Sequence, residues 1–248
     1  MTGINLCRLP VSAHGRRAQG FSMIEMAVAL VVIGLLVSAS GAYLGVFGSS
    51  HKLGADARLV SLSESVIAFA GARNRLPCPD TAGAGYEAGT PCPASIQVGW
   101  FPYVSMGLSQ PPDKDRAIYG VYRNPAVSAD LAVVTGPVPP ATEPVRLLTK
   151  LNAAAAQGAS NNFVYLTGDA TAANGAENCA GNIVSNPAFV ILAPGEDRSG
   201  DDVRVDGIHS TLPGSGRCFA APTRGVDTNF DDRTLAVSAY AVLARLNQ

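Results

Sequence analysis

The chain has 248 residues, of which 47% are hydrophobic, and a formal net charge of −1. This length fits one sizeable domain together with an additional apolar segment. The near-neutral charge argues against general binding to the phosphate backbone of nucleic acid, which requires an excess of Lys and Arg. The sequence contains no G-x-S-x-G, H-E-x-x-H, P-loop or Rossmann motif, so we expect no enzymatic activity.

The first 20 residues form a basic leader before a long uncharged run. The leader contains three arginines and no acidic residue, and residues 26–50 carry no formal charge. Residues 26–47 supply the roughly 20 apolar residues that a membrane-spanning helix needs. Because basic residues favour the cytoplasmic side, the amino terminus is expected there. The sequence therefore predicts a single transmembrane segment over about residues 26–47.

One carboxylate, Glu25, stands immediately before this apolar run. A charged side chain beside hydrocarbon is costly and usually has a function and a partner. Residues 20–37, GFSMIEMAVALVVIGLLV, resemble the processing and assembly signature of type IV pilins and type II secretion pseudopilins. In that family a prepilin peptidase cuts after the glycine and methylates the new aromatic amino terminus. The resemblance implies cleavage between Gly20 and Phe21, and pairing of Glu25 with the amino terminus of a neighbouring subunit.

An ordinary secretory signal is the alternative interpretation of the same segment. It would be cleaved after the small residues 38–40 and would leave Gly41 as the mature amino terminus. A basic region that ends in a glutamate is unusual for such a signal, and the apolar run continues beyond Ser40. The corresponding function would be a Sec-exported or membrane-tethered periplasmic binding module that does not polymerise.

A long helix is predicted to follow the leader. No proline occurs from Phe21 to Leu76, and apolar residues recur at helical spacing in its second part. We expect this helix to stop before Pro77. The stripe consists of Leu59, Leu62, Val66 and Phe69. The predicted divisions of the chain are a leader (1–20), a long helix (21–74) and a globular head (75–248).

The head has the pattern of short strands separated by turns rich in Gly, Pro, Asn and Asp. The predicted strands are Ala117–Tyr122, Asp130–Thr135, Phe163–Thr167, Ala188–Leu192 and Thr234–Ala239. A helix is predicted over Glu143–Gln157, and the tail Tyr240–Leu246 fits either a helix or a further strand. The expected fold class is α+β, with an antiparallel sheet packed on the exposed half of the long helix. The pilin resemblance implies the same architecture.

Four of the five cysteines lie in the head and predict two disulfide bonds. Four cysteines allow three pairings, and proximity in the sequence favours Cys78 with Cys92 and Cys179 with Cys218. A zinc site is the alternative, but the spacing contains no C-x-x-C pair.

Two acidic loops contain candidate ligands for calcium, which prefers carboxylate and carbonyl oxygens. The resemblance to major pseudopilins, which hold calcium near a carboxy-terminal acidic turn, points in the same direction. Neither loop has an EF-hand pattern, and solvated turns in which Asp side chains accept backbone N–H groups are the favoured interpretation. No other cofactor is expected. The candidate residues are Asp197, Asp201, Asp202, Asp231 and Asp232.

The resemblance implies a structural subunit that acts through assembly. Its expected partners are other pilin or pseudopilin subunits, a prepilin peptidase, an inner-membrane assembly platform and membrane lipid, with no nucleic acid. The expected location is the inner membrane, with the head in the periplasm, and later a filament in the periplasm or at the cell surface. The large head favours a minor subunit, and the signature is shared by type II secretion systems and type IV pili.

Overall fold

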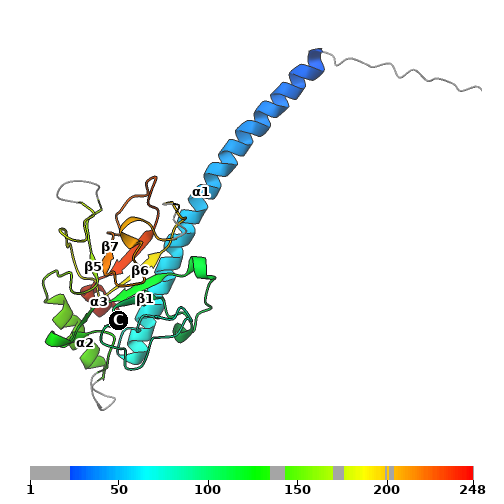
Figure 1. Cartoon of the computed structure of the whole chain (residues 1–248). Coiled ribbons are helices and arrows are strands. Elements are labelled where there is room, and N and C mark those ends of the chain that lie inside the picture. Colours follow the sequence, from blue (N-terminus) through cyan, green and yellow to red (C-terminus); the bar gives the residue numbers. More distant parts are fainter. Residues whose placement is uncertain (1–22, 135–142, 170–175, 199, 201–203, 248) are drawn as a thin grey trace, which may run out of the picture. The chain divides into compact units, whose positions relative to one another are not determined.

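The computed structural model describes residues 23–134, 143–169, 176–198, 200 and 204–247. The chain divides into two compact units, residues 1–51 and residues 52–248 (Figure 1). The helices are α1 (Met23–Arg73), α2 (Glu143–Ala155) and α3 (Ala239–Leu246). The strands are β1 (Val98–Trp100), β2 (Ile118–Val121), β3 (Arg123–Asn124), β4 (Ala129–Asp130), β5 (Tyr165–Leu166), β6 (Phe189–Ala193), β7 (Cys218–Phe219) and β8 (Arg233–Val237).

The second unit is built around a four-stranded antiparallel sheet in the order β1-β2-β6-β8. Successive residues of a strand point to opposite faces of a sheet. Tyr119 of β2 and Phe189 of β6 therefore share one face and one hydrophobic cluster, while Ile118 and Val190 belong to a second cluster. Helices and an antiparallel sheet make the fold α+β, as the sequence predicts.

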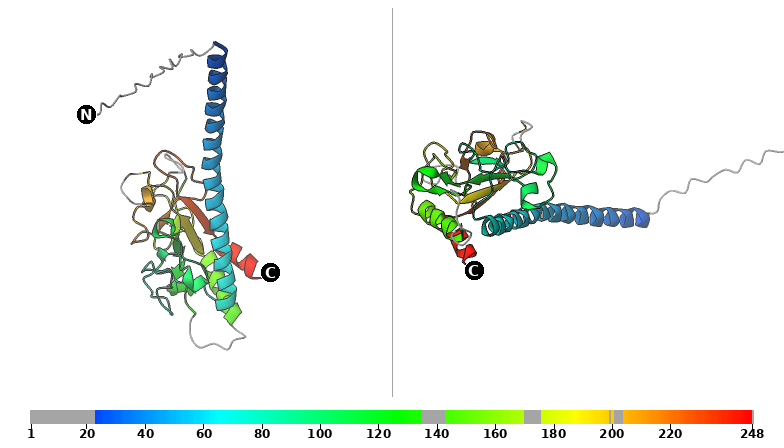
Figure 2. Two further views of the ribbon diagram at one scale, coloured as in Figure 1. Left: turned by 90° about the vertical axis from the view of Figure 1, so that its right-hand side faces the viewer. Right: turned by 90° about the horizontal axis from the view of Figure 1, so that it is seen from below.

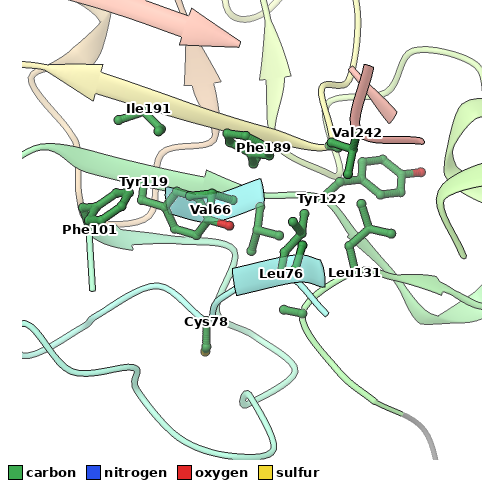
Figure 3. Packing of buried hydrophobic residues seen from close by; sticks show 14 of the residues in the cluster. Val66, Leu76, Cys78, Phe101, Tyr119, Tyr122, Leu131, Phe189, Ile191 and Val242 are labelled. Carbon is green, nitrogen blue, oxygen red and sulfur yellow. The ribbon is translucent and has the colours of Figure 1, made fainter. Parts of the chain in front are cut away.

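The carboxy-terminal part of α1 packs on the first face of this sheet. Its buried stripe belongs to the same cluster as the sheet residues Tyr119 and Phe189, and Figure 3 shows Val66 close to Tyr119. The i, i+3, i+7 and i+11 spacing places these side chains on one side of a helix. The stripe consists of Leu59, Leu62, Val66 and Ala70.

The prediction that Phe69 belongs to the buried stripe of α1 was wrong. Phe69 is only half-buried, and the guanidinium of Arg75 lies over its ring at 5.1 Å. Ala70 takes the core position instead, because a small side chain allows the helix to lie close to the sheet. The helix ends at Arg73, where Asn74 adopts a left-handed conformation (φ 54°) and its N–H donates to the carbonyl of Ala70 at 2.9 Å. This is a common helix C-cap, so the helix stops at Arg73, with three residues between it and Pro77.

Helix α3 closes the fold beside α1, and Figure 2 shows the two helices next to each other in the second unit. Ser238 caps α3, since its hydroxyl accepts the N–H of Ala241 at 3.2 Å. Val242 is fully buried in the main cluster, and Arg245 forms an ion pair with Glu64 of α1. The tail is thus a helix, one of the two structures that its sequence allows.

Several predicted strands have different bounds or partners. The strand predicted at 163–167 is only two residues long and pairs in parallel with β7, outside the main sheet. The strand predicted at 130–135 is replaced by the short β4, which pairs with β3, and residue 135 lies outside the described residues. Strands β1 and β7 were not predicted. These two-residue and three-residue strands exist through pairing with distant segments, which local sequence does not reveal.

The hairpin of β3 and β4 is held by a buried arginine. Arg123 is 2% exposed and forms a bidentate pair with Asp130, with N–O distances of 2.9 and 2.7 Å. Its remaining N–H groups donate to backbone carbonyls, among them those of Cys92 and Ile96 at 3.2 and 2.9 Å. A planar guanidinium with five donors suits such a site. Arg123 therefore joins the hairpin to the loop that precedes β1.

Two disulfide bonds are present, Cys78–Cys92 and Cys179–Cys218. These are the pairs that proximity in the sequence favours. The first closes a loop directly after α1, and Cys78 is fully buried in the main cluster (Figure 3). The second joins the segment before β6 to β7. Each bond restricts the unfolded chain and thereby stabilises the folded one.

Candidate functional site

The residues predicted to take part in processing and assembly lie at the amino-terminal end. Gly20 and Phe21 fall outside the described residues. Glu25 lies in α1, and its side chain is likewise outside the description. The roles proposed for these three residues therefore stay predictions.

The described side chains at the start of α1 are apolar and exposed. Seven large apolar residues between positions 24 and 33 are 48–74% exposed in the single chain. A contiguous apolar surface of this kind normally contacts another molecule. They are Ile24, Met26, Val28, Leu30, Val31, Val32 and Ile33.

Among the residues that the structure describes, no helix meets the length and hydropathy that a membrane span requires. The predicted span of residues 26–47 includes residues 34–47, whose side chains are not among those described. The span stays a prediction.

The head contains an acidic cluster assembled from two loops. One ligand oxygen each from Asp206, Asp231 and Asp232 lies within 4.8 Å of the others. Asp231 and Asp232 precede β8, and Asp206 directly precedes a short 3-10 helix over Gly207–His209. Asp231 and Asp232 were predicted from the sequence as calcium candidates, and Asp206 was not.

The side chain of Asp232 is fully buried and accepts three hydrogen bonds. Its Oδ1 accepts the N–H of Gly195 at 3.0 Å. Its Oδ2 accepts the N–H of Asp206 at 3.0 Å and lies 2.7 Å from Nδ1 of His209. A buried carboxylate needs such partners, because transfer from water without them is costly. Asp232 thus connects Gly195, Asp206 and His209 to the start of β8.

His209 is held in one tautomer. Its Nε2 accepts the backbone N–H of Ala220 at 3.0 Å, so the ring proton lies on Nδ1 and is donated to Asp232. The ring is fully buried between Phe219 and Phe230, with centroid distances of 6.0 and 5.4 Å. Since both ring nitrogens are engaged inside the protein, His209 has a structural role and does not reach a substrate.

Asp231 pairs with a guanidinium. Arg198 Nε lies 2.8 Å from Asp231 Oδ2, and the backbone N–H of Arg198 donates to Asp206 at 3.2 Å. The hydrogen bond with Asp231 raises the pKa of Arg198 above its ordinary value. The absence of a side chain at Gly195 leaves room for the Asp231 carboxylate, which a Cβ at this position would displace. A cation at this cluster would therefore compete with Arg198 for Asp231.

The other calcium candidates are not part of the cluster as described. Asp197 accepts the N–H of Gly200 at 2.7 Å in a local turn. Asp201 and Asp202 lie outside the described residues. Asp227, in the second acidic loop, pairs with Arg224 at 2.6 Å, which lowers the pKa of Asp227. These contacts are typical of Asp side chains that stabilise turns, and calcium binding stays the alternative interpretation.

Comparison with known families identifies the amino-terminal segment. The family described as the prokaryotic N-terminal methylation motif matches residues 15–41. This motif is the prepilin-type signature of type IV pilins and pseudopilins, and it spans the predicted cleavage position, Glu25 and the first part of the apolar run. Neither the curated proteins nor the solved structures contain a significant match to the chain.

Proposed function

We propose that this chain, whose residues 15–41 carry the prepilin-type methylation signature, is a pilin-like structural subunit of a type II secretion pseudopilus or a type IV pilus. The signature is the observation that carries the proposal. A prepilin peptidase cuts between Gly20 and Phe21 and methylates Phe21. The cut chain then assembles with other pilin-like subunits at an inner-membrane platform.

The physical argument for assembly is the surface at the start of α1. The exposed apolar side chains of residues 24–33 need a cover of lipid or of neighbouring helices. Before assembly the inner membrane supplies this cover, with the amino terminus in the cytoplasm and the head in the periplasm. In the filament the helices of neighbouring subunits supply it.

The head is the part that the proposed subunit presents outside the membrane. A helix packed on one face of an antiparallel sheet is compatible with the pilin-like architecture that the signature implies. The head is large and has two disulfide bonds, and we propose a minor subunit that acts by presenting this surface and has no catalytic role.

The mature amino terminus tests the proposal. The chain is expressed with a cognate prepilin peptidase, and the membrane fraction is analysed by mass spectrometry. We expect a chain that begins at N-methylated Phe21. A chain that begins at Gly41 would instead support a Sec-exported binding module and contradict the proposal.

A substitution at the cleavage position sharpens the test. Gly20→Val places a branched side chain where the peptidase must approach the backbone closely, so we expect the full-length precursor to accumulate. Thr2→Val introduces the same residue far from the cleavage position and is expected to leave processing unchanged. Normal release of the mature chain from Gly20→Val would argue against cleavage by a prepilin peptidase.

A further inference from the structure

An apolar groove runs along the strand β8 at one side of the main sheet. The groove has a volume of about 270 Å³ and lies between the carboxy-terminal part of α1, β8 and α3. Its apolar lining includes Val60 and Ile67 from α1, Leu235 and Val237 from β8, and Ala241 from α3. All of these residues belong to the second unit.

Strand β8 is an edge strand. It pairs with β6 on one side, and no other described strand pairs with it. Such an edge presents a row of main-chain N–H and C=O groups that a further strand can join. Edge strands are usually protected by proline or by inward-pointing charge. In β8 the one charge is Arg233 at the first position, which pairs with Asp56, and the four residues that follow, Thr-Leu-Ala-Val, contain neither.

The charges around the groove specify what it can hold. The charged side chains that line it are Glu64 and Arg245, and these two already pair with each other. A second pair, Asp56 with Arg233 at 4.0 Å, links α1 to the start of β8. A ligand in the groove therefore meets an apolar surface whose bordering charges are compensated, so it must itself be uncharged where it faces the groove.

We propose that β8 and this groove bind an extended segment of a partner polypeptide. The segment adds a strand beside β8 through main-chain hydrogen bonds and places uncharged, apolar side chains at alternate positions into the groove. This is the recognition mode in which the main chain supplies affinity and pockets for alternate side chains supply specificity. The proposal does not depend on processing at Gly20.

A second copy of this chain is a poorer occupant. In β8, Arg233 shares a face with Leu235 and Val237, because side chains of alternate residues lie on the same side of a strand. If β8 of a second copy paired with this edge, it would bring a guanidinium to a groove that already contains Arg245. The proposed partner is therefore a different polypeptide.

N-methylated peptides test strand addition directly. The probe is a fluorescein-labelled peptide, Ser-Val-Thr-Val-Thr-Val-Thr-Ser, added to the full chain in non-ionic detergent micelles, and binding is measured by fluorescence anisotropy. Two further peptides are N-methylated at every Val or at every Thr. Successive residues of a strand direct their N–H groups to opposite sides. One methylated peptide therefore loses the donors that face β8, and the other loses the outward-facing ones.

We expect one methylated peptide to bind as tightly as the unmodified probe and the other to bind at least tenfold more weakly. Which of the two binds also reports the direction of the added strand. Equal binding of both methylated peptides would show an apolar contact without strand pairing and would overturn the proposal. Failure of the unmodified probe to bind would overturn it as well.

Two valine variants locate the peptide in the groove. Val60→Asp places a carboxylate in the groove, and Val184→Asp places the same group on a loop elsewhere. The two valines are 51% and 55% exposed, so both variants are expected to fold normally, with circular dichroism as the check. We expect Val60→Asp to weaken binding at least tenfold and Val184→Asp to leave it unchanged.

The variants also separate the proposed partner from a second copy. Equal affinity of both variants for the probe would place the peptide elsewhere and contradict the proposal. Analytical ultracentrifugation of the detergent complexes then asks whether the chain pairs with itself. A wild-type dimer that Val60→Asp abolishes would make a second copy the occupant, which also contradicts the proposal.

Discussion

At the scale of single residues, the head depends on buried polar side chains that connect distant loops. Asp232 and His209 lie 23 positions apart and are hydrogen-bonded to each other, and together they accept the backbone N–H groups of Gly195, Asp206 and Ala220. A buried donor or acceptor that loses its partner costs about 1–3 kcal/mol. The arrangement therefore makes the position of each loop depend on the others.

Replacement of His209 by leucine tests this connection. The variant keeps an apolar side chain of moderate size but leaves Asp232 Oδ2 without its Nδ1–H donor and the N–H of Ala220 without its acceptor. We expect the free energy of unfolding to fall by about 3 kcal/mol, which is the sum expected for the loss of two buried hydrogen bonds. Urea unfolding of the full chain in mild detergent, followed by the fluorescence of its one tryptophan, Trp100, measures it.

Ser210→Ala is the control for this variant, because Ser210 is exposed beside His209 and a surface substitution usually changes stability by less than about 0.5 kcal/mol. If His209→Leu unfolds at the same urea concentration as Ser210→Ala, the hydrogen bonds of His209 do not stabilise the head.

The effect of calcium on thermal stability tests whether the acidic cluster binds a cation. Asp231 already pairs with Arg198, and Asp232 already accepts three hydrogen bonds. We therefore expect the melting temperature of the chain to be the same in a chelator and in about 1 mM calcium, a concentration at which extracellular calcium modules are occupied. Differential scanning calorimetry measures both. A rise of several degrees with calcium, and none with magnesium, would show a calcium site.

The sequence contained part of the acidic cluster. The run Asp231-Asp232 marked an acidic loop, whose favoured interpretation was a solvated turn stabilised by Asp side chains. Asp232 differs from it, because this side chain is buried and accepts N–H groups of residues distant in the sequence. Asp206 and His209 were not predicted as its partners, because contacts between residues more than 20 positions apart leave no local pattern. The dipeptide Asp206-Gly207, a turn signal in which Gly207 has a positive φ of 55°, was the available hint.

At the scale of elements, periodicity predicted the longer ones. Helix α2 and the strands β2, β6 and β8 appear near the predicted positions, because each has an apolar pattern of several residues that faces the core. Three of the four buried stripe residues of α1 were predicted, and the fourth was predicted to be Phe69 but is Ala70. Short strands such as β5 and β7 carry too few residues for a period to be seen.

Two valines on α1 distinguish its buried face from its open face. Val66 is fully buried against the sheet, and Val60 is half-exposed on the groove side. Val66→Ala removes two buried carbon atoms and leaves a cavity, so we expect a loss of about 2 kcal/mol in the free energy of unfolding. Val60→Ala makes the same chemical change with an expected loss below about 1 kcal/mol. Urea unfolding of both variants compares them, and equal losses would contradict the packing of α1 on the sheet.

At the scale of the whole molecule, assembly is proposed to depend on one carboxylate. In a close-packed bundle of apolar helices, the methylated amine of Phe21 needs a counter-charge, and Glu25 of a neighbouring subunit is the proposed source. Leaving one partner of a buried ion pair alone costs about 3–5 kcal/mol. An action of Glu25 on the helix dipole alone would contribute only about 0.3–1 kcal/mol. The size of the effect therefore separates the two roles.

Glu25→Val is expected to be cut normally at Gly20 and to enter filaments at least tenfold less often than the wild type. The chain is expressed with its cognate assembly machinery, processing is checked by mass spectrometry, and the sheared or cross-linked filament fraction is measured. Glu25→Gln keeps the shape without the charge and should show the same defect if charge is what matters. Equal incorporation of wild type and Glu25→Val would refute the pairing role.

The ion pair between Glu64 and Arg245 joins residues that lie 181 positions apart. The strand β8 and the helix α3 are the last elements of the chain, yet they complete the sheet and cover α1, the first helix. Without β8 and α3, the edge of β6 would be unpaired and the main cluster would lose Ala239 and Val242. Loss of β8 and α3 would therefore expose main-chain groups and apolar side chains, which are the features that proteases and chaperones recognise.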